Sequence, residues 1–341
     1  MKRLYDVVVI RSIAIVMVVA YHAYGMMYWD GHFPETAEKY KELYFVINQY
    51  VLNFRMPMFL FISGYLFSYL ETEKHKYPTF TALVKNKFKR LIIPYLIFTT
   101  IYMLTTGMGF NLKILLSGWL AHLWFIATLF WCFIFTRLSA LIPYSRTLWF
   151  KFVLLAISFI LLFPDLPLIG FLGIQELPEW FFWFYLGYVI SPHREQLFRY
   201  MSKRKIWLFI LTAVYSLGLV YTITISGNEE ESSWFIYPGQ VSIVLLAWYI
   251  TNYAIRNTSK AWYENRIFKE LNRTSYGIYV LHYWLQVLIV SPSVKQILHL
   301  DELAANHVYV FPLMLFLTTL LMSYIGARIL LKTAVGRFLI G

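Results

Sequence analysis

Long apolar segments recur in this chain from residue 7 to about residue 331, with only short polar gaps between them. A helix needs about 20 mostly apolar residues to cross the hydrocarbon core of a bilayer. Because 59% of the residues are apolar and only 14% are charged, lipid is the expected solvent. We therefore expect an all-α polytopic membrane protein, with a single integral membrane domain over 1–341. The predicted spans are 7–28, 44–70, 91–107, 120–141, 148–163, 175–191, 206–226, 234–255, 274–292 and 308–331.

The positive charges follow a pattern that predicts the orientation of these spans. Lys and Arg lie almost entirely in one set of alternating loops, and the opposite set holds only Lys39, Lys41, Lys113 and Lys295. Because Lys and Arg accumulate on the cytoplasmic side, we expect about ten transmembrane helices with both termini in the cytoplasm. The net charge of +12 is then a topology signal, and its partner is anionic lipid rather than nucleic acid.

Ionisable residues inside the first two spans are candidates for function, because each costs at least a few kcal/mol there. Arg11 and His22 are eleven residues apart, so a helix brings both to one face, about 16 Å apart along its axis. Arg55 stands two residues before Pro57 and needs an anion, a carbonyl or water beside it. The structural alternatives are an interfacial Arg, a His satisfied by a backbone carbonyl, and an Arg that pins a kinked helix.

Further candidates lie in later spans. His122 stands near the outer end of the fourth span, and Tyr279 and His282 share one face of the ninth. Aromatic residues at that spacing are also typical of packing. The three histidines lack the spacing of a metal motif, so no metal is expected. A histidine suits acyl transfer, because it can take a proton from an attacking hydroxyl and return one to the leaving group.

A basic cluster precedes the third span, in "KNKFKRLIIPY" at 85–95. Such a cluster can bind the phosphates of a nucleotide-like donor. Membrane topology alone also places Lys and Arg at this position, so both interpretations stay open. The cluster comprises Lys85, Lys87, Lys89 and Arg90.

Taken in order, six motifs of this chain resemble the acyltransferase-3 family of integral membrane carbohydrate O-acyltransferases. The motifs are "RSIAIVMVVAYH" (11–22), "FRMPMFLFISGYLF" (54–67), "KRLIIPY" (89–95), "HLWFIATL" (122–129), "SYGIYVLHY" (275–283) and "GRFLIG" (336–341). The resemblance covers essentially the whole chain, although 140–260 matches only in hydropathy. Many members have Asp and Gly where this chain has Val8 and Ser12, and His where it has Arg55.

The resemblance implies an enzyme that transfers acyl groups other than amino-acyl groups. The donor would be acetyl-CoA or another acyl-CoA, used as a co-substrate, with no permanently bound cofactor. The acceptor would be a hydroxyl of a cell-envelope or exported glycan, and the location the bacterial cytoplasmic (inner) membrane. The acyl group, the sugar, and the choice between direct transfer and a covalent acyl-histidine relay stay open. A glycan exporter or other secondary transporter and a non-catalytic scaffold are the alternatives.

The same resemblance assigns roles to residues. His22 would be the catalytic histidine, with Arg11 as its partner in the donor channel and Arg55 lining the same cavity. The basic cluster would face the phosphates of coenzyme A. Independently of the resemblance, we expect five further residues to bind the acceptor or line the cavity: His122, Tyr279, His282, Glu176 and Glu179.

Overall fold

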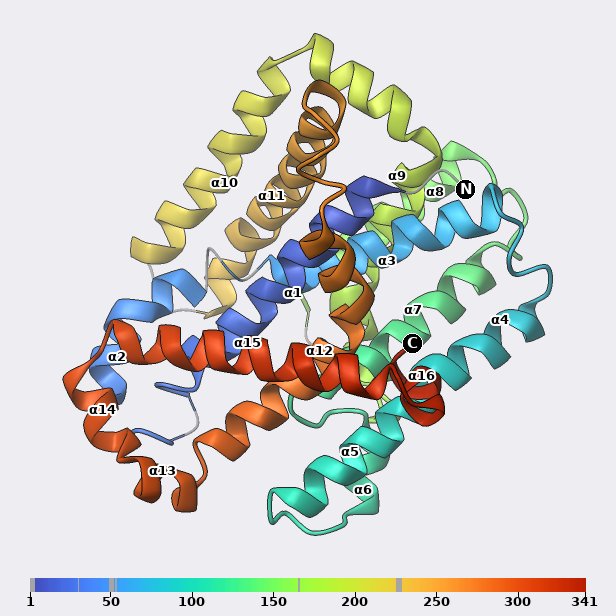
Figure 1. Cartoon of the computed structure of the whole chain (residues 1–341). Coiled ribbons are helices and arrows are strands. Elements are labelled where there is room, and N and C mark those ends of the chain that lie inside the picture. Colours follow the sequence, from blue (N-terminus) through green and yellow to red (C-terminus); the bar gives the residue numbers. More distant parts are fainter. Residues whose placement is uncertain (1–3, 30, 49–51, 53, 165, 225–228) are drawn as a thin grey trace. The chain divides into compact units, whose positions relative to one another are not determined.

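The computed structural model describes residues 4–29, 31–48, 52, 54–164, 166–224 and 229–341. All regular secondary structure among these residues is helical (Figure 1). Every predicted span overlaps a helix, although parts of 44–70 and 206–226 lie outside the described residues. The predicted all-α class is therefore confirmed. The overlapping helices are α1 (Tyr5–Gly25), α3 (Arg55–Thr72), α5 (Ile93–Thr105), α7 (Trp124–Ser139), α8 (Leu148–Ile160), α9 (Leu177–Lys203), α10 (Ile206–Thr224), α11 (Glu229–Asn257), α12 (Arg266–Ile289) and α15 (Val310–Leu330).

Within the described residues, four helical stretches are long and apolar enough to cross a membrane. They are Tyr5–Gly25, Phe80–Thr105, Leu112–Ser139 and Val310–Leu330. A fifth is formed if α12 and α13 (Pro292–Leu298), which are bent by 63° at their junction, count as one broken span. The chain is thus a helical membrane protein, while ten crossings and cytoplasmic termini stay predictions.

The second predicted span, 44–70, is wrong in its boundaries. Helix α2 (Ala37–Val46) ends inside it, and α3 begins only at Arg55. Pro57 therefore lies in the first turn of α3 rather than within a kinked helix. A proline is tolerated there, because the first backbone N–H groups of a helix have no intrahelical partner.

Two compact units, interleaved along the chain, divide the structure. Unit 1 comprises Met1–Ile10, Pro57–Ile97 and Leu112–Tyr263. Unit 2 comprises Arg11–Met56, Phe98–Asn111 and Glu264–Gly341. The single membrane domain over 1–341 stays a prediction.

In unit 1, α3 and α9 approach closely through two glycines. A Cβ atom on Gly64 would lie 1.8 Å from the backbone oxygen of Phe184, and one on Gly187 would lie 1.9 Å from that of Phe61. Each glycine thus packs against the backbone of the other helix. Small residues of this kind allow the close helix contacts on which packing in membranes depends.

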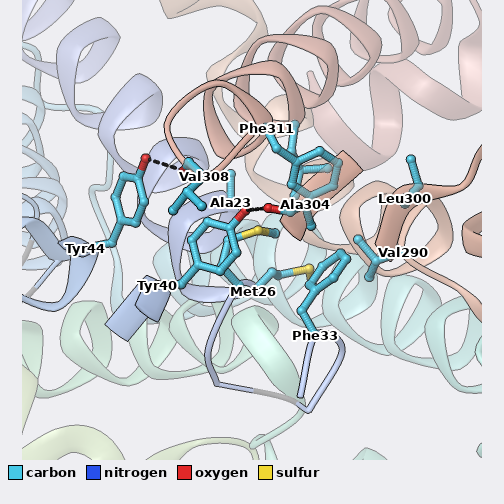
Figure 2. Close-up of a cluster of buried hydrophobic side chains, with 12 residues drawn as sticks. Ala23, Met26, Phe33, Tyr40, Tyr44, Val290, Leu300, Ala304, Val308 and Phe311 are labelled. Atoms are coloured by element: carbon cyan, nitrogen blue, oxygen red, sulfur yellow. Dashed lines mark hydrogen bonds between the residues drawn. The ribbon is translucent and has the colours of Figure 1, made fainter. Parts of the chain in front are cut away.

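In unit 2, a buried cluster holds together α1, α2, the end of α12 and the segment leading into α15 (Figure 2). The Tyr40 hydroxyl donates to the carbonyl of Ala304 at 2.6 Å, and the Tyr44 hydroxyl donates to that of Val308 at 3.0 Å. These bonds connect α2 to α14 (Leu300–Asn306) and to the chain just after it. Ala23, which follows His22, belongs to the same cluster, so the cluster fixes the end of α1.

The glycine contact predicts a stability effect. Gly64→Ala or Gly187→Ala forces a methyl group into a backbone of the facing helix, and such overpacking costs about 1–3 kcal/mol. We expect a lower thermal unfolding midpoint for either variant in detergent, measured on purified protein. Gly170→Ala is the control, because nothing lies within 4 Å of the added methyl group. Equal midpoints for Gly64→Ala and Gly170→Ala would contradict the packing described.

Candidate functional site

The predicted site residues fall into two sets, one in each unit. Unit 2 holds Arg11, His22, Arg55, Tyr279 and His282. Unit 1 holds Lys85, Lys87, Lys89, Arg90, His122, Glu176 and Glu179.

The imidazole rings of His22 and His282 are in direct contact. His22 belongs to α1 and His282 to α12, and their ring centroids are 5.0 Å apart. Nε2 of His282 lies 3.2 Å from Nδ1 of His22. The His282 side chain is fully buried, whereas His22 is partly exposed. The structure therefore brings together two histidines that are separated by 260 positions in the chain.

The hydrogen bonds around this pair determine which nitrogen carries each proton. Nδ1 of His282 lies 2.6 Å from the carbonyl oxygen of Tyr279, which only accepts, so Nδ1 is the donor and Nε2 of the neutral ring accepts. Nδ1 of His22 lies between that Nε2 and the carbonyl oxygen of Val18, at 2.9 Å. Because both neighbours are acceptors, Nδ1 of His22 carries a proton. The basic lone pair of the neutral His22 ring is then on Nε2.

One structural alternative was a histidine satisfied by a backbone carbonyl, and the contact of His22 with Val18 is such a bond. The contact with His282 is additional. The Val18 bond occupies Nδ1 alone. It fixes the tautomer in which Nε2 accepts protons, as the orienting group of a catalytic histidine does. His282 supports the same tautomer from a second helix.

Arg55 lies beside this pair at the start of α3. Its guanidinium carbon is 3.1 Å from the centre of the Tyr21 ring, and Nη1 donates to the carbonyl of Leu52 at 3.2 Å. Its Nε has no hydrogen-bond partner among the described residues, and only 8% of the residue is exposed. Its charge also acts on Tyr279 and His282. The ring of Tyr21 and the Leu52 carbonyl offset the unfavourable placement of a cation at a helix N-terminus.

Two buried amides near His22 were not predicted. The Gln286 Nε2 donates to the carbonyl of Val19 at 3.2 Å. The Asn48 Nδ2 donates to the carbonyl of Tyr21 at 3.2 Å. Gln286 follows His282 by four residues, so it shares its helix face, and this spacing was the signal available in the sequence. Asn48 offered no such signal, because it lies outside any regular pattern.

Arg11 lies on the same unbroken helix as His22, as predicted. It is partly exposed, and its guanidinium has no hydrogen-bond or ion-pair partner among the described residues. Between the two, Ile15 and Val18 are fully buried, so the shared face is packed rather than open. The hydroxyl of Ser12 donates to the carbonyl of Phe268 at 3.2 Å and ties α1 to α12.

The basic cluster of unit 1 lies where α4 (Phe80–Lys87) passes into the π-helical segment η2 (Phe88–Ile92). Its residues other than Lys87 are exposed, and the ammonium of Lys87 lies 3.4 Å from the centre of the Phe133 ring. In the same unit, Glu71 pairs with Arg137, and Glu73 pairs with Arg194 at 2.7 Å. π-Helical turns are frequent at functional sites, because they alter which side chains project together.

The remaining predicted residues of unit 1 lie on segments held beside α7. His122 is buried in the short helix η3 (Ala121–Leu123), and Glu176 ends η4 (Ile174–Glu176). The hydroxyl of Thr128 donates to the carbonyl of Gly173 at 3.2 Å and ties the start of η4 to α7. Glu179 is exposed in the first turn of α9. No three His, Cys, Asp or Glu side chains in the described part of the chain gather as metal ligands do, and the expected absence of a metal stays a prediction.

These features define a class: a helical membrane protein in which a histidine, oriented by a second histidine, lies beside a buried arginine. The family model for the acyltransferase-3 family, described as an acyltransferase domain, matches residues 4–327. The chain belongs to the acyltransferase-3 family. It is a membrane acyltransferase of the kind that transfers groups other than amino-acyl groups, and neither a glycan exporter nor a scaffold is favoured. No curated protein and no solved structure matches the chain.

The contact of Arg55 with Tyr21 predicts the effect of two substitutions. Tyr21→Leu removes the ring face and should lower stability by about 0.5–2 kcal/mol, the range of cation–π interactions. Tyr21→Phe keeps the ring face and loses only the hydroxyl, which also interacts with Arg55, so it should lose less stability than Tyr21→Leu. Thermal unfolding of the purified variants measures both. A loss as large in Tyr21→Phe as in Tyr21→Leu would show that the hydroxyl, not the ring face, is what stabilises the arginine.

Proposed function

We propose that this acyltransferase moves an acetyl or related short acyl group from acyl-CoA to a hydroxyl of a cell-envelope or exported glycan, with His22 as the catalytic base. The observation that carries the proposal is the position of the His22 Nδ1 between the Val18 carbonyl and the His282 ring. It leaves the basic lone pair on Nε2 of a partly exposed ring, which is what proton abstraction from a hydroxyl requires.

In the direct mechanism, Nε2 takes the proton of the acceptor hydroxyl as its oxygen attacks the thioester carbonyl. The tetrahedral intermediate then collapses, the carbon–sulfur bond breaks, and the coenzyme A sulfur leaves with the proton from Nε2. The imidazolium formed in between donates its Nδ1 proton to the Val18 carbonyl and to Nε2 of His282. His282 is thus a positioning residue. In the covalent alternative, the same Nε2 attacks the thioester carbonyl first, the carbon–sulfur bond breaks and coenzyme A leaves as the thiolate. The acceptor oxygen then attacks the acyl carbon, the bond to Nε2 breaks, and the proton of the hydroxyl passes to the thiolate.

The positive charge of Arg55 would stabilise the negative charge that develops on the thioester oxygen. The Nε–H group of its buried guanidinium has no partner among the described residues, so it is available to this oxygen. A preorganised donor of this kind is worth most where water is excluded. Arg11, which has no anionic partner among the described residues, would bind the donor further along α1.

The basic cluster from Lys85 to Arg90 would bind the phosphates of coenzyme A. Its exposed ammonium and guanidinium groups and its π-helical geometry support this role. Tyr279, His122, Glu176 and Glu179 would line the acceptor side. With ten crossings and both termini in the cytoplasm of a bacterial inner membrane, the basic cluster would face the cytosolic donor and His22 would lie toward the outer surface.

The proposal predicts the phenotype of His22→Gln. Removal of a general base lowers the rate by about 10²- to 10⁴-fold, so the acyl group should disappear from the surface glycan. The measurement is mass spectrometry of surface glycans from a deletion strain, complemented with wild type or with the variant at matched membrane levels. His307→Gln is the control, because His307 is an exposed histidine of the same unit.

Restoration of one acyl mass by the wild type and by His307→Gln, but not by His22→Gln, is the expected result. Full acylation by His22→Gln at normal protein level would overturn the catalytic role of His22. If the surface glycan of the deletion strain keeps its full acyl content, the glycan is not the acceptor of this enzyme.

A further inference from the structure

Helix α8 ends before the apolar part of the sequence does. It has 13 residues, Leu148–Ile160, which extend about 20 Å at a rise of about 1.5 Å per residue. The hydrocarbon core of a bilayer is about 30 Å thick, so α8 alone does not cross it. Between Lys151 and Glu176 the sequence holds one charged residue, Asp165, which lies outside the described residues. The chain therefore stays apolar well beyond the end of the helix.

The segment 166–172, which follows α8, has exposed apolar side chains on an irregular backbone. Ile169 is 83% exposed, more than Ile160 at the end of α8, which is 63% exposed. Full burial of such a side chain is worth about 1.5–3 kcal/mol, so several of them in water would be unfavourable. The other exposed apolar residues of the segment are Leu166, Leu168 and Phe171.

A second apolar segment, 112–119, lies beside the first. The backbone N–H group of Leu172 donates to the carbonyl of Leu116 at 2.7 Å. A Cβ atom on Gly118 would lie 1.8 Å from the backbone nitrogen of Gly173, so the two backbones are in direct contact. The second segment consists of α6 (Leu112–Ser117) and the two residues after it. We call the exposed apolar residues of both segments the apolar loop surface: Leu112, Trp119, Leu166, Leu168, Ile169 and Phe171.

Hydrogen bonds fix the apolar loop surface to α7. Nε1 of Trp131 donates to the carbonyl of Leu172 at 2.9 Å, and the hydroxyl of Thr128 donates to that of Gly173. Helix α7 belongs to a stretch that is long and apolar enough to cross a membrane. The apolar loop surface is therefore held at a fixed depth relative to that stretch.

The composition of the apolar loop surface fits lipid better than a protein partner. Lys113 is the only charged residue of the two segments, and a lysine side chain can extend to the lipid headgroups. Protein interfaces draw most of their binding energy from Trp, Tyr and Arg, whereas four of the six residues here are Leu or Ile. An irregular backbone needs water or headgroups for its polar atoms, so the centre of the bilayer is excluded. Trp119 is of a residue type that is enriched at the membrane interface.

We propose that the apolar loop surface inserts into the bilayer leaflet at the C-terminal end of α8, where it contacts lipid acyl chains just below the headgroups. With the topology proposed above, this is the outer leaflet. Two segments that lie between predicted spans thereby complete the apolar thickness that α8 lacks. The insertion is independent of the reaction that the protein catalyses.

The test is the depth of a nitroxide spin label, measured by electron paramagnetic resonance on the full-length protein in nanodiscs of phosphatidylethanolamine and phosphatidylglycerol. The label is attached to Ile169→Cys. Cys132, the only cysteine of the chain, is buried, and the wild type treated with the same reagent gives the background. Oxygen, which partitions into lipid, and a water-soluble nickel chelate report the depth. We expect the label about 5–10 Å inside the boundary between headgroups and acyl chains.

Two further labelled variants of unit 1 provide the references. Ile157→Cys lies on the exposed face of α8 and should be accessible to oxygen but not to nickel. Lys74→Cys lies at an exposed position of a polar loop and should be accessible to nickel. The label at Ile169 should resemble that at Ile157. Leu168→Cys is the second test position where Ile169→Cys does not accumulate.

A nickel accessibility at the test position as high as at Lys74 would overturn the proposal, because the apolar loop surface would then lie in water. Poor access of both reagents would also overturn it, because protein would then cover the surface. The measurement uses neither donor nor acceptor, so its failure is distinguishable from a failure of the proposed function.

Discussion

The Nδ1 atom of His22 lies between a carbonyl of its own helix and the ring of a second histidine, and the function that we propose for His22 depends on this position. In lipid, a polar ring inside a helix must find partners in the protein, because no water satisfies it. Two partners of His22, the carbonyl of Val18 and Nε2 of His282, both accept a hydrogen bond from its Nδ1. The contacts that stabilise the His22 ring therefore also determine which of its nitrogens is basic.

The surrounding structure of unit 2 holds this geometry in place. Tyr40 and Tyr44 connect α2 to α14 and the chain after it, around the cluster that contains Ala23 and Val290. Ala23 is the next residue after His22, and Val290 directly follows α12. The catalytic role that we propose for His22 requires its position to be held to within a fraction of an ångström, and packing around both helix ends favours that rigidity. The hydrogen bond that the Tyr40 hydroxyl donates to Ala304 therefore helps to hold His22 in position.

Much of the fold and part of the site could be predicted from the sequence. The length of the apolar segments identified the helices, because a segment such as 308–331 is long and apolar enough to cross a membrane as a helix. The eleven-residue spacing placed Arg11 and His22 on one helix, because helical geometry is local. The boundary at Arg55 was missed, since an apolar run does not show where a first turn begins. The contact of His22 with His282 is set by packing between α1 and α12, so no spacing in the chain could predict it.

The two amides show a further limit of sequence reasoning. Beyond the spacing of Gln286 from His282, the sequence does not distinguish a glutamine or asparagine in an apolar segment from a residue that only bonds its own helix. What separates Gln286 and Asn48 is that their nitrogens bind α1 while their oxygens have no partner in the described structure. That distinction depends on atoms from three separate parts of the chain.

The tautomer of the His22 ring can be measured by ¹⁵N NMR. The protein would be labelled with ¹⁵N-histidine in nanodiscs at a pH where the site is neutral, and the signals of His22 assigned by comparison with His22→Gln. We predict a protonated Nδ1 and an unprotonated Nε2 for His22, with His282 in the same tautomer. A His22 signal with the proton on Nε2 would overturn the proposed role of His22, because Nε2 would then have no lone pair to accept the hydroxyl proton.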